Sequence, residues 1–170
     1  MKSRLKAYRS ARQVFNEVIS ALKEAELEFS ADKRVRVASV PMAGPVQPYV
    51  IFVAVTPTLL IFSVPYYCHL PPVTDPIRRL KLYEKLLVLN DKIGVIKFCY
   101  DRKTRHIVLS LEIPWHGVWF APSTLFDCLE GLSGVAAEYQ RSVVSAGLAL
   151  HGDDNLGESS PITTQSPVGT

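Results

Sequence analysis

The sequence predicts an α+β protein in which a twisted antiparallel sheet of about five strands carries three helices, in the order α-β-β-β-α-β-β-α. Three stretches repeat apolar residues every three or four positions, which is the period of a helix. Five shorter stretches are rich in Val, Ile, Phe and Tyr and are bounded by proline, glycine or polar turns, which is typical of strands. Because the strands come in runs of three and two, the order favours antiparallel pairing and excludes a doubly wound nucleotide-binding fold.

The bulk composition indicates one globular domain followed by a tail. The chain has 170 residues, of which 48% are hydrophobic and 21% are charged. A chain of this length and composition can bury one hydrophobic core. We expect the domain to cover residues 1–150. Residues 151–170 lack aromatic residues and periodicity and contain three acidic groups, which predicts a disordered acidic tail.

The first helix is expected over Ala11 to Glu28. Ser10 and Gln13 have the spacing of a capping box, in which each side chain bonds to the backbone amide of the other residue. The helix would bury one apolar stripe, made of Ala11, Val14, Phe15, Val18, Leu22, Ala25 and Phe29. The basic residues before it make this N-terminal helix start positively charged.

Three strands are expected at 34–41, 49–55 and 58–64. Residues 37–74 contain no Asp, Glu, Lys or Arg, and the stretch 49–67 has the length of a membrane span. Pro57 and Pro65 interrupt it, however, and its residues are strand formers, so two strands joined by a "TPT" turn are favoured over a span. The second and third strands are apolar on both faces, which predicts that the face away from the helices meets a subunit, a partner or the proline-rich loop.

A second helix and a hairpin follow. Asp75 and Pro76 form an N-cap with proline at the first helical position, and the helix is expected over 76–89. One apolar face contains Ile77, Leu80, Tyr83 and Leu87, and Leu82, Leu86 and Leu89 widen it. Asn90 is expected to close this helix in the left-handed conformation, and Gly94 to relieve the turn into a strand. Strands at 95–100 and 106–113 then flank the polar loop "DRKTR". The second strand alternates, with Ile107, Leu109, Leu111 and Ile113 on one face and His106, Val108, Ser110 and Glu112 on the other.

The third helix is expected from Pro122 to about Leu150. Its apolar stripe is Leu125, Cys128, Leu129, Leu132, Ala136, Tyr139, Val143 and Ala146. Gly131, Gly134 and Ala137 lie near one another, and glycine in a helix costs about 1 kcal/mol relative to alanine. We therefore expect another helix or strand to approach closely at these residues.

The junction "LLVLNDKIGVIKFCYD", joined to "RHIVLSLEIP" and followed by an S/T-x-L helix start, resembles the YbjN-like family. The resemblance covers roughly residues 74 to 145, and within the family it is closest to a cyanobacterial group of unassigned function. It implies the fold of type III secretion chaperones, and a non-enzymatic, homodimeric module that binds another protein chain.

The expected partner-binding residues are the aromatic side chains that flank the uncharged strands and the third helix. Tyrosine and tryptophan anchor many protein contacts; here they are Tyr66, Tyr67, Trp115, Trp119 and Phe120. Packing inside the protein is the alternative interpretation of the same residues.

A second functional hypothesis is a regulator that binds nucleic acid or a membrane surface. The first twelve residues carry five positive and no negative charges, and a basic arm of this kind attracts anions. Its residues are Lys2, Arg4, Lys6, Arg9 and Arg12, with Arg78, Lys81 and Lys85 as a second basic stripe.

An enzyme is the least favoured hypothesis. Cys99 and His106 are the only geometric candidates for a nucleophile and its base, if they lie opposite each other across the hairpin. We identify no phosphate-binding motif, no metal site and no cofactor. The three cysteines form no C-x-x-C pair and no signal peptide is recognisable, which predicts a reducing, cytoplasmic location.

Overall fold

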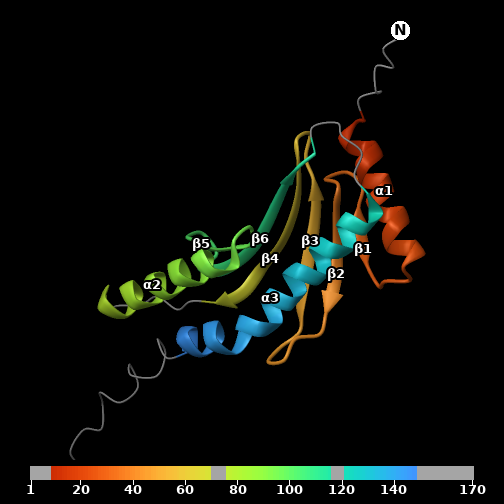
Figure 1. The fold of residues 1–170 in the computed structure, drawn as a ribbon. Coiled ribbons are helices and arrows are strands. Elements are labelled where there is room, and N and C mark those ends of the chain that lie inside the picture. The colour runs from red at the N-terminus through yellow and green to blue at the C-terminus, as the bar shows by residue number, and fades with distance from the viewer. Residues whose placement is uncertain (1–8, 70–75, 116–120, 149–170) are drawn as a thin grey trace, which may run out of the picture.

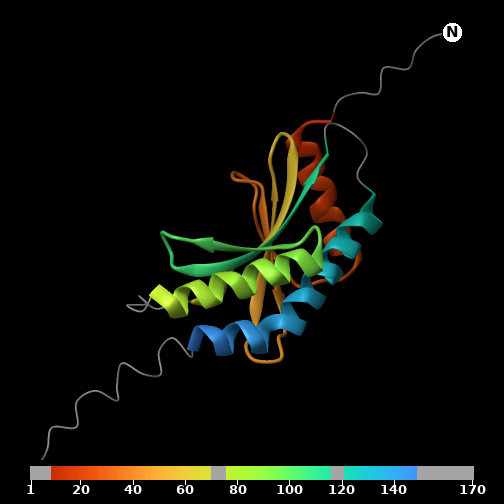
Figure 2. The same ribbon diagram turned by 60° about the vertical axis from the view of Figure 1, so that its left-hand side comes forward.

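The computed structural model describes residues 9–69, 76–115 and 121–148. Within them three helices pack against one face of a single sheet (Figures 1 and 2), which confirms the α+β class. The elements are α1 Ala11–Glu24, β1 Ser30–Asp32, β2 Val37–Met42, β3 Tyr49–Val55, β4 Leu59–His69, α2 Pro76–Ile93, β5 Lys97–Asp101, β6 His106–Pro114 and α3 Pro122–Leu148.

The sheet has six strands in the spatial order β1-β2-β3-β4-β6-β5, and every neighbouring pair is antiparallel. The additional strand is β1, a three-residue edge strand that was not predicted. The central strand β4 is long and carries an irregularity between Val64 and Cys68, beyond which its pairing with β6 resumes.

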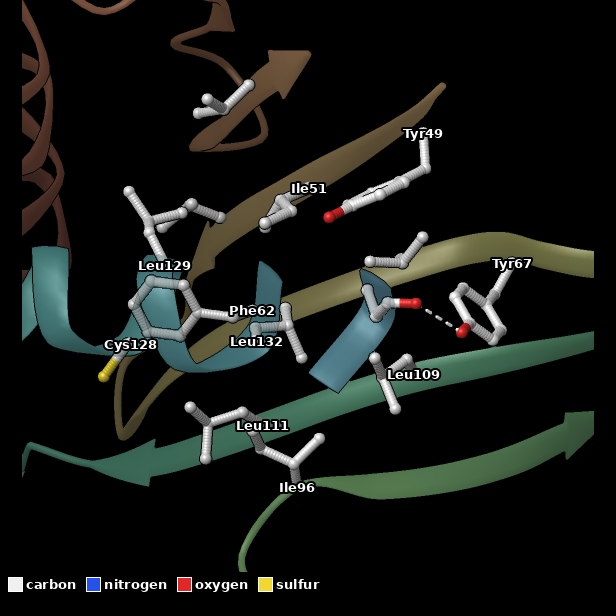
Figure 3. Packing of buried hydrophobic residues seen from close by; sticks show 14 of the residues in the cluster. Tyr49, Ile51, Phe62, Tyr67, Ile96, Leu109, Leu111, Cys128, Leu129 and Leu132 are labelled. Atoms are coloured by element: carbon white, nitrogen blue, oxygen red, sulfur yellow. Dashed lines mark hydrogen bonds between the residues drawn. The ribbon is translucent and has the colours of Figure 1, made fainter. Parts of the chain in front are cut away.

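The core lies between the helices and the inner face of the sheet (Figure 3). Alternate residues of β3 and β4 point into it, as the two-residue period of a strand requires; they include Ile51, Val53, Leu60 and Phe62, all essentially buried. The predicted alternation of β6 is confirmed as well, because Ile107, Leu109 and Leu111 are buried.

Helix α1 begins as predicted and ends early. The capping box is present, with Ser10 and Gln13 bonded reciprocally. The helix ends at Glu24, not Glu28, because Ala25 caps it and Glu26 takes a left-handed conformation with φ of 54°. Phe29 still packs against the core, but from the connection to β1.

The first predicted strand, 34–41, is wrong at its start. Residues 33–36 form the turn between β1 and β2, and Arg36 has a left-handed φ of 57°. The buried residues of β2 are therefore Ala38 and Val40, while Val35 is 60% exposed.

Helix α2 continues through Asn90 to Ile93, so the expected left-handed closure at Asn90 is wrong. The Asn90 side chain bonds instead to the backbone of Phe98: its Oδ1 accepts from the Phe98 N–H at 2.7 Å and its Nδ2 donates to the Phe98 carbonyl at 2.9 Å. Gly94 has a φ of 76°, which confirms its predicted role in the turn.

The hairpin of β5 and β6 is confirmed, but its register contradicts the proposed Cys99–His106 pair. Cys99 lies opposite Val108, and His106 lies opposite Asp101. The loop therefore contains residues 102–105 only, because Asp101 pairs within the ladder and also caps the turn through bonds to Lys103 and Thr104.

Candidate protein-binding surfaces

The uncharged strand β4 places its two adjacent tyrosines on opposite sides of the sheet. Tyr66 is 63% exposed and its ring meets the ring of His106 edge-on, with 5.1 Å between centroids. Tyr67 is fully buried, and its hydroxyl donates to the carbonyl of Ala136 at 2.6 Å. The structure therefore supports an accessible Tyr66 and corrects the predicted surface position of Tyr67, which is a core residue.

Trp115 also lies inside the protein, only 5% exposed. Its indole Nε1 donates to the carbonyl of Thr56 at 3.1 Å, and its backbone N–H donates to the carbonyl of Thr58 at 3.1 Å. Trp115 thus holds the β3–β4 turn against the end of β6 and is not a surface anchor. Trp119 and Phe120 lie outside the described residues.

The predicted anion-binding arm is only partly described. Arg9 forms an ion pair with Glu17 on α1, and Arg12 is exposed; Lys2, Arg4 and Lys6 lie outside the described residues. In the second basic stripe, Lys85 donates to the carbonyl of Ser142 at 3.0 Å and so joins α2 to α3. The anion-binding hypothesis stays a prediction.

Helix α2 exposes large apolar side chains along the side that faces away from the core. Its inner side buries Leu82, Leu86 and Leu89. Its outer side exposes 66% of Leu80, 69% of Leu87 and 49% of Val88, and Ile77 is 65% exposed in the first turn. We call Ile77, Leu80, Leu87 and Val88 the α2 outer stripe.

These four residues share one side of the helix because a helical residue turns by about 100° from the one before it, which places positions 77, 80, 87 and 88 within about one third of the circumference. The helical period groups Ile77, Leu80, Tyr83 and Leu87 on one apolar face, which Leu82, Leu86 and Leu89 widen. In the structure the widening residues are the buried ones, and Ile77, Leu80 and Leu87 are exposed.

The outer face of the sheet carries apolar residues of β3 and β4, as predicted. Val50 is 37% exposed, and Phe52 and Ile61 are half-buried. Ser39 and Ser63 flank Phe52 in register on the two neighbouring strands. This face is therefore mixed, and none of the three described helices covers it (Figure 2).

A groove of about 480 Å³ opens between α3 and β2. Its lining is mostly apolar and includes Leu27, Val40, Met42, Phe126, Leu129 and Gly134. A Cβ atom added to Gly131 or Gly134 would meet nothing within 4 Å. The close approach expected at these glycines is therefore not made by the described residues, and at Gly134 the space belongs to the groove.

The titratable groups in the interior are held neutral. Burial raises the pKa of the Cys68 thiol, and burial together with nearby Asp127 raises the pKa of the Cys128 thiol. Burial, and after it the neighbouring Tyr49 and Cys68, raise the pKa of Tyr67. Protonated thiols are poor nucleophiles, so these two cysteines serve packing.

No protein-family model matches the chain, and no curated protein matches its sequence. Among solved structures, the chain is similar to a chain of the heterodimeric ExoU–SpcU complex from the type III secretion system of Pseudomonas aeruginosa. The identity is 19%, the TM-score is 0.48, and the match covers 75% of this chain and 94% of that one. It is also similar to a chain of the HopA1–SchA chaperone–effector complex, with 14% identity, a TM-score of 0.49, and coverage of 78% and 94%. Within the described residues, no helix has the length and hydropathy of a membrane span.

Proposed function

We propose that this protein is a non-enzymatic, chaperone-like module that binds another protein chain and acts as a cytoplasmic homodimer, with the α2 outer stripe as its dimer contact. The observation that carries the proposal is that α2 exposes four large apolar side chains on the side away from the core, around the charged Glu84. Large exposed apolar patches mark interaction sites. The YbjN-like resemblance, with its homodimeric protein-binding role, points the same way.

A two-fold dimer uses the same patch on both copies, so every residue of the stripe would be buried twice. Burying a leucine contributes about 1.5–3 kcal/mol. Replacing Leu80 and Leu87 in both copies removes four such side chains, and the dimer dissociation constant should then rise at least 100-fold, since each 1.4 kcal/mol is tenfold.

Sedimentation-velocity analysis over a concentration series tests the dimer. The wild type should sediment as a dimer, and the L80S/L87S variant as a monomer at the same concentration. Val35→Ser is the matched control, because Val35 is equally exposed at the far end of the sheet. A monomeric wild type, or an L80S/L87S variant that dimerises as strongly as the control, would overturn the proposal.

The client chain is proposed to bind the other apolar surface, the outer face of β3 and β4 around Phe52 with Tyr66 at its end. Crosslinked partners should be recovered with wild type, with Val35→Ser and with the monomeric variant, and lost with a Phe52→Ser/Tyr66→Ser variant. Equal recovery with that variant would exclude this face and leave the dimer proposal intact.

A further inference from the structure

Two histidines that are far apart in the sequence meet across adjacent strands. His69, the last residue of β4, lies opposite His106, the first residue of β6. Their ring centroids are 4.8 Å apart and the ring planes are inclined by 52°. Tyr66 contacts the His106 ring as well, so three side chains gather at this end of the strands.

The His106 ring contains an unsatisfied atom. Its Nδ1 is buried and has no hydrogen-bond partner. Leaving a buried polar group without a partner costs about 1–3 kcal/mol, and such an atom in a native protein commonly marks a bound ion or water. The unsatisfied nitrogen belongs to the ring that packs against a second imidazole.

The separation of the two rings fits chelation of one metal ion. With metal–nitrogen bonds of about 2.0–2.1 Å, two imidazoles at about 90–109° around a metal have ring centres about 4.5–5.2 Å apart. The observed 4.8 Å lies within this range. The antiparallel pairing of β4 with β6 keeps the two residues opposite each other, so little rearrangement of the backbone is needed.

The ligand atoms decide the class of ion. Asp101 lies opposite His106 on β5, but its carboxylate accepts hydrogen bonds from the Lys103 backbone and the Thr104 side chain. The described residues contain no set of three His, Cys, Asp or Glu side chains arranged to hold a metal. The chain therefore supplies two imidazole ligands, and water completes the coordination. Imidazole suits zinc, copper and nickel, and not magnesium or calcium.

We propose that His69 and His106 form a two-histidine site for a divalent late transition-metal ion, which links β4 to β6 beside the hairpin. Because the ion would bridge two strands of the folded sheet, it should also stabilise the native state.

Calorimetric titration of the untagged full chain with Ni²⁺, and separately with Zn²⁺, tests the site. We expect one ion per chain, and at least a tenfold loss of affinity in His69→Gln and in His106→Gln. A His116→Gln/His151→Gln variant removes the remaining histidines and should bind as the wild type does. Thermal unfolding gives an independent readout, because the ion should raise the melting temperature of the wild type and of that control only.

His69 is exposed at the end of its strand, so His69→Gln should fold even if His106→Gln does not, and it then decides the question. Unchanged affinity and stoichiometry in His69→Gln would overturn the proposal. So would a loss of binding in the His116→Gln/His151→Gln control while His69→Gln binds normally, because the ion would then be held adventitiously elsewhere.

Discussion

Gln140 of α3 is fully buried, and its side-chain oxygen accepts a hydrogen bond from the backbone N–H of Val46 at 3.0 Å. The same oxygen is 3.4 Å from the N–H of Gln47, and the side-chain nitrogen donates to the Gln47 carbonyl at 2.9 Å. The side-chain amide of Gln140 thus bonds two backbone N–H groups and one backbone carbonyl of the loop between β2 and β3. The loop lies far from Gln140 in the sequence, so this contact fixes the position of α3 against the sheet.

Replacing Gln140 with leucine should therefore destabilise the protein strongly. The leucine fits the volume, but it leaves buried backbone groups of the loop without partners, each at a cost of about 1–3 kcal/mol. We expect the free energy of unfolding to fall by about 2–4 kcal/mol in urea denaturation. Arg141→Gln, one position along and exposed, should stay within about 0.5 kcal/mol of the wild type; comparable losses in the two variants would contradict the role assigned to Gln140.

Gly44 is needed in the same loop because no side chain fits there. A Cβ atom on Gly44 would lie 2.3 Å from the Gln47 carbonyl oxygen and 2.7 Å from the Gln140 side-chain oxygen. Gly44→Ala should lower the free energy of unfolding by about 1–3 kcal/mol, as overpacking does. Gly131→Ala is the matched control with the opposite sign: it meets nothing within 4 Å, and alanine in a helix should stabilise it by about 0.5–1 kcal/mol. Two changes of the same sign in urea denaturation would refute this explanation.

The buried hydroxyl of Tyr67 should make stability fall at high pH. Its pKa is raised above the ordinary tyrosine value of 10.0 in the folded protein, chiefly by burial, so above pH 10 the unfolded chain releases a proton that the folded chain keeps. The stabilisation is complete below pH 10 and is lost as the pH rises, at up to about 1.4 kcal/mol per pH unit.

Tyr67→Phe tests this by removing the ionisable group. At pH 7 it should cost about 1 kcal/mol, because the bond to Ala136 is lost. Between pH 9 and pH 11, its stability should decline less steeply than that of the wild type in urea denaturation. Tyr66→Phe, at the exposed neighbour, should retain the wild-type slope. Identical slopes for wild type and Tyr67→Phe would rule out Tyr67 as the titrating group.

The elements with a strong local period could be predicted from the sequence, and those decided by distant contacts could not. The capping box of Ser10 and the alternation of β6 are local patterns, and both are confirmed. Ala25 and Phe29 continue the apolar period of the helix, so no local pattern predicts that Glu26 takes a left-handed conformation and that α1 ends before it. Tyr66 and Tyr67 are adjacent and chemically alike. Alternation from Val64 would place Tyr66 inside, and only the irregularity in β4 after Val64 buries Tyr67 instead.

The candidate sites show the same limit. Helix α2 is leucine-rich on two sides, so its sequence cannot say which side faces the core. The structure buries Leu82, Leu86 and Leu89 and exposes the α2 outer stripe. His69 and His106 are separated in the sequence by α2 and β5, and their meeting depends on β4 pairing with β6 past the irregularity after Val64. Gln140 looks like a surface residue in a helix, because its partners are loop amides that no spacing within α3 can reveal.

Asn90 has a demanding role that differs from the predicted one, and this leads to the last prediction. Its side chain bonds to both backbone groups of Phe98, as a neighbouring strand would, and so joins α2 to the start of β5. Asn90→Ala removes both bonds and should lower the free energy of unfolding by about 1–3 kcal/mol. Asn90→Asp keeps the bond from the Phe98 N–H but places an acceptor against the Phe98 carbonyl, so it should fail to restore stability. Asn16→Ala, at an exposed position on α1, should change stability by less than about 0.5 kcal/mol in the same urea denaturation. If Asn90 acted only as a helix terminator, Asn90→Gly would be tolerated best of all; if it acts as a strand partner, glycine should be at least as damaging as alanine.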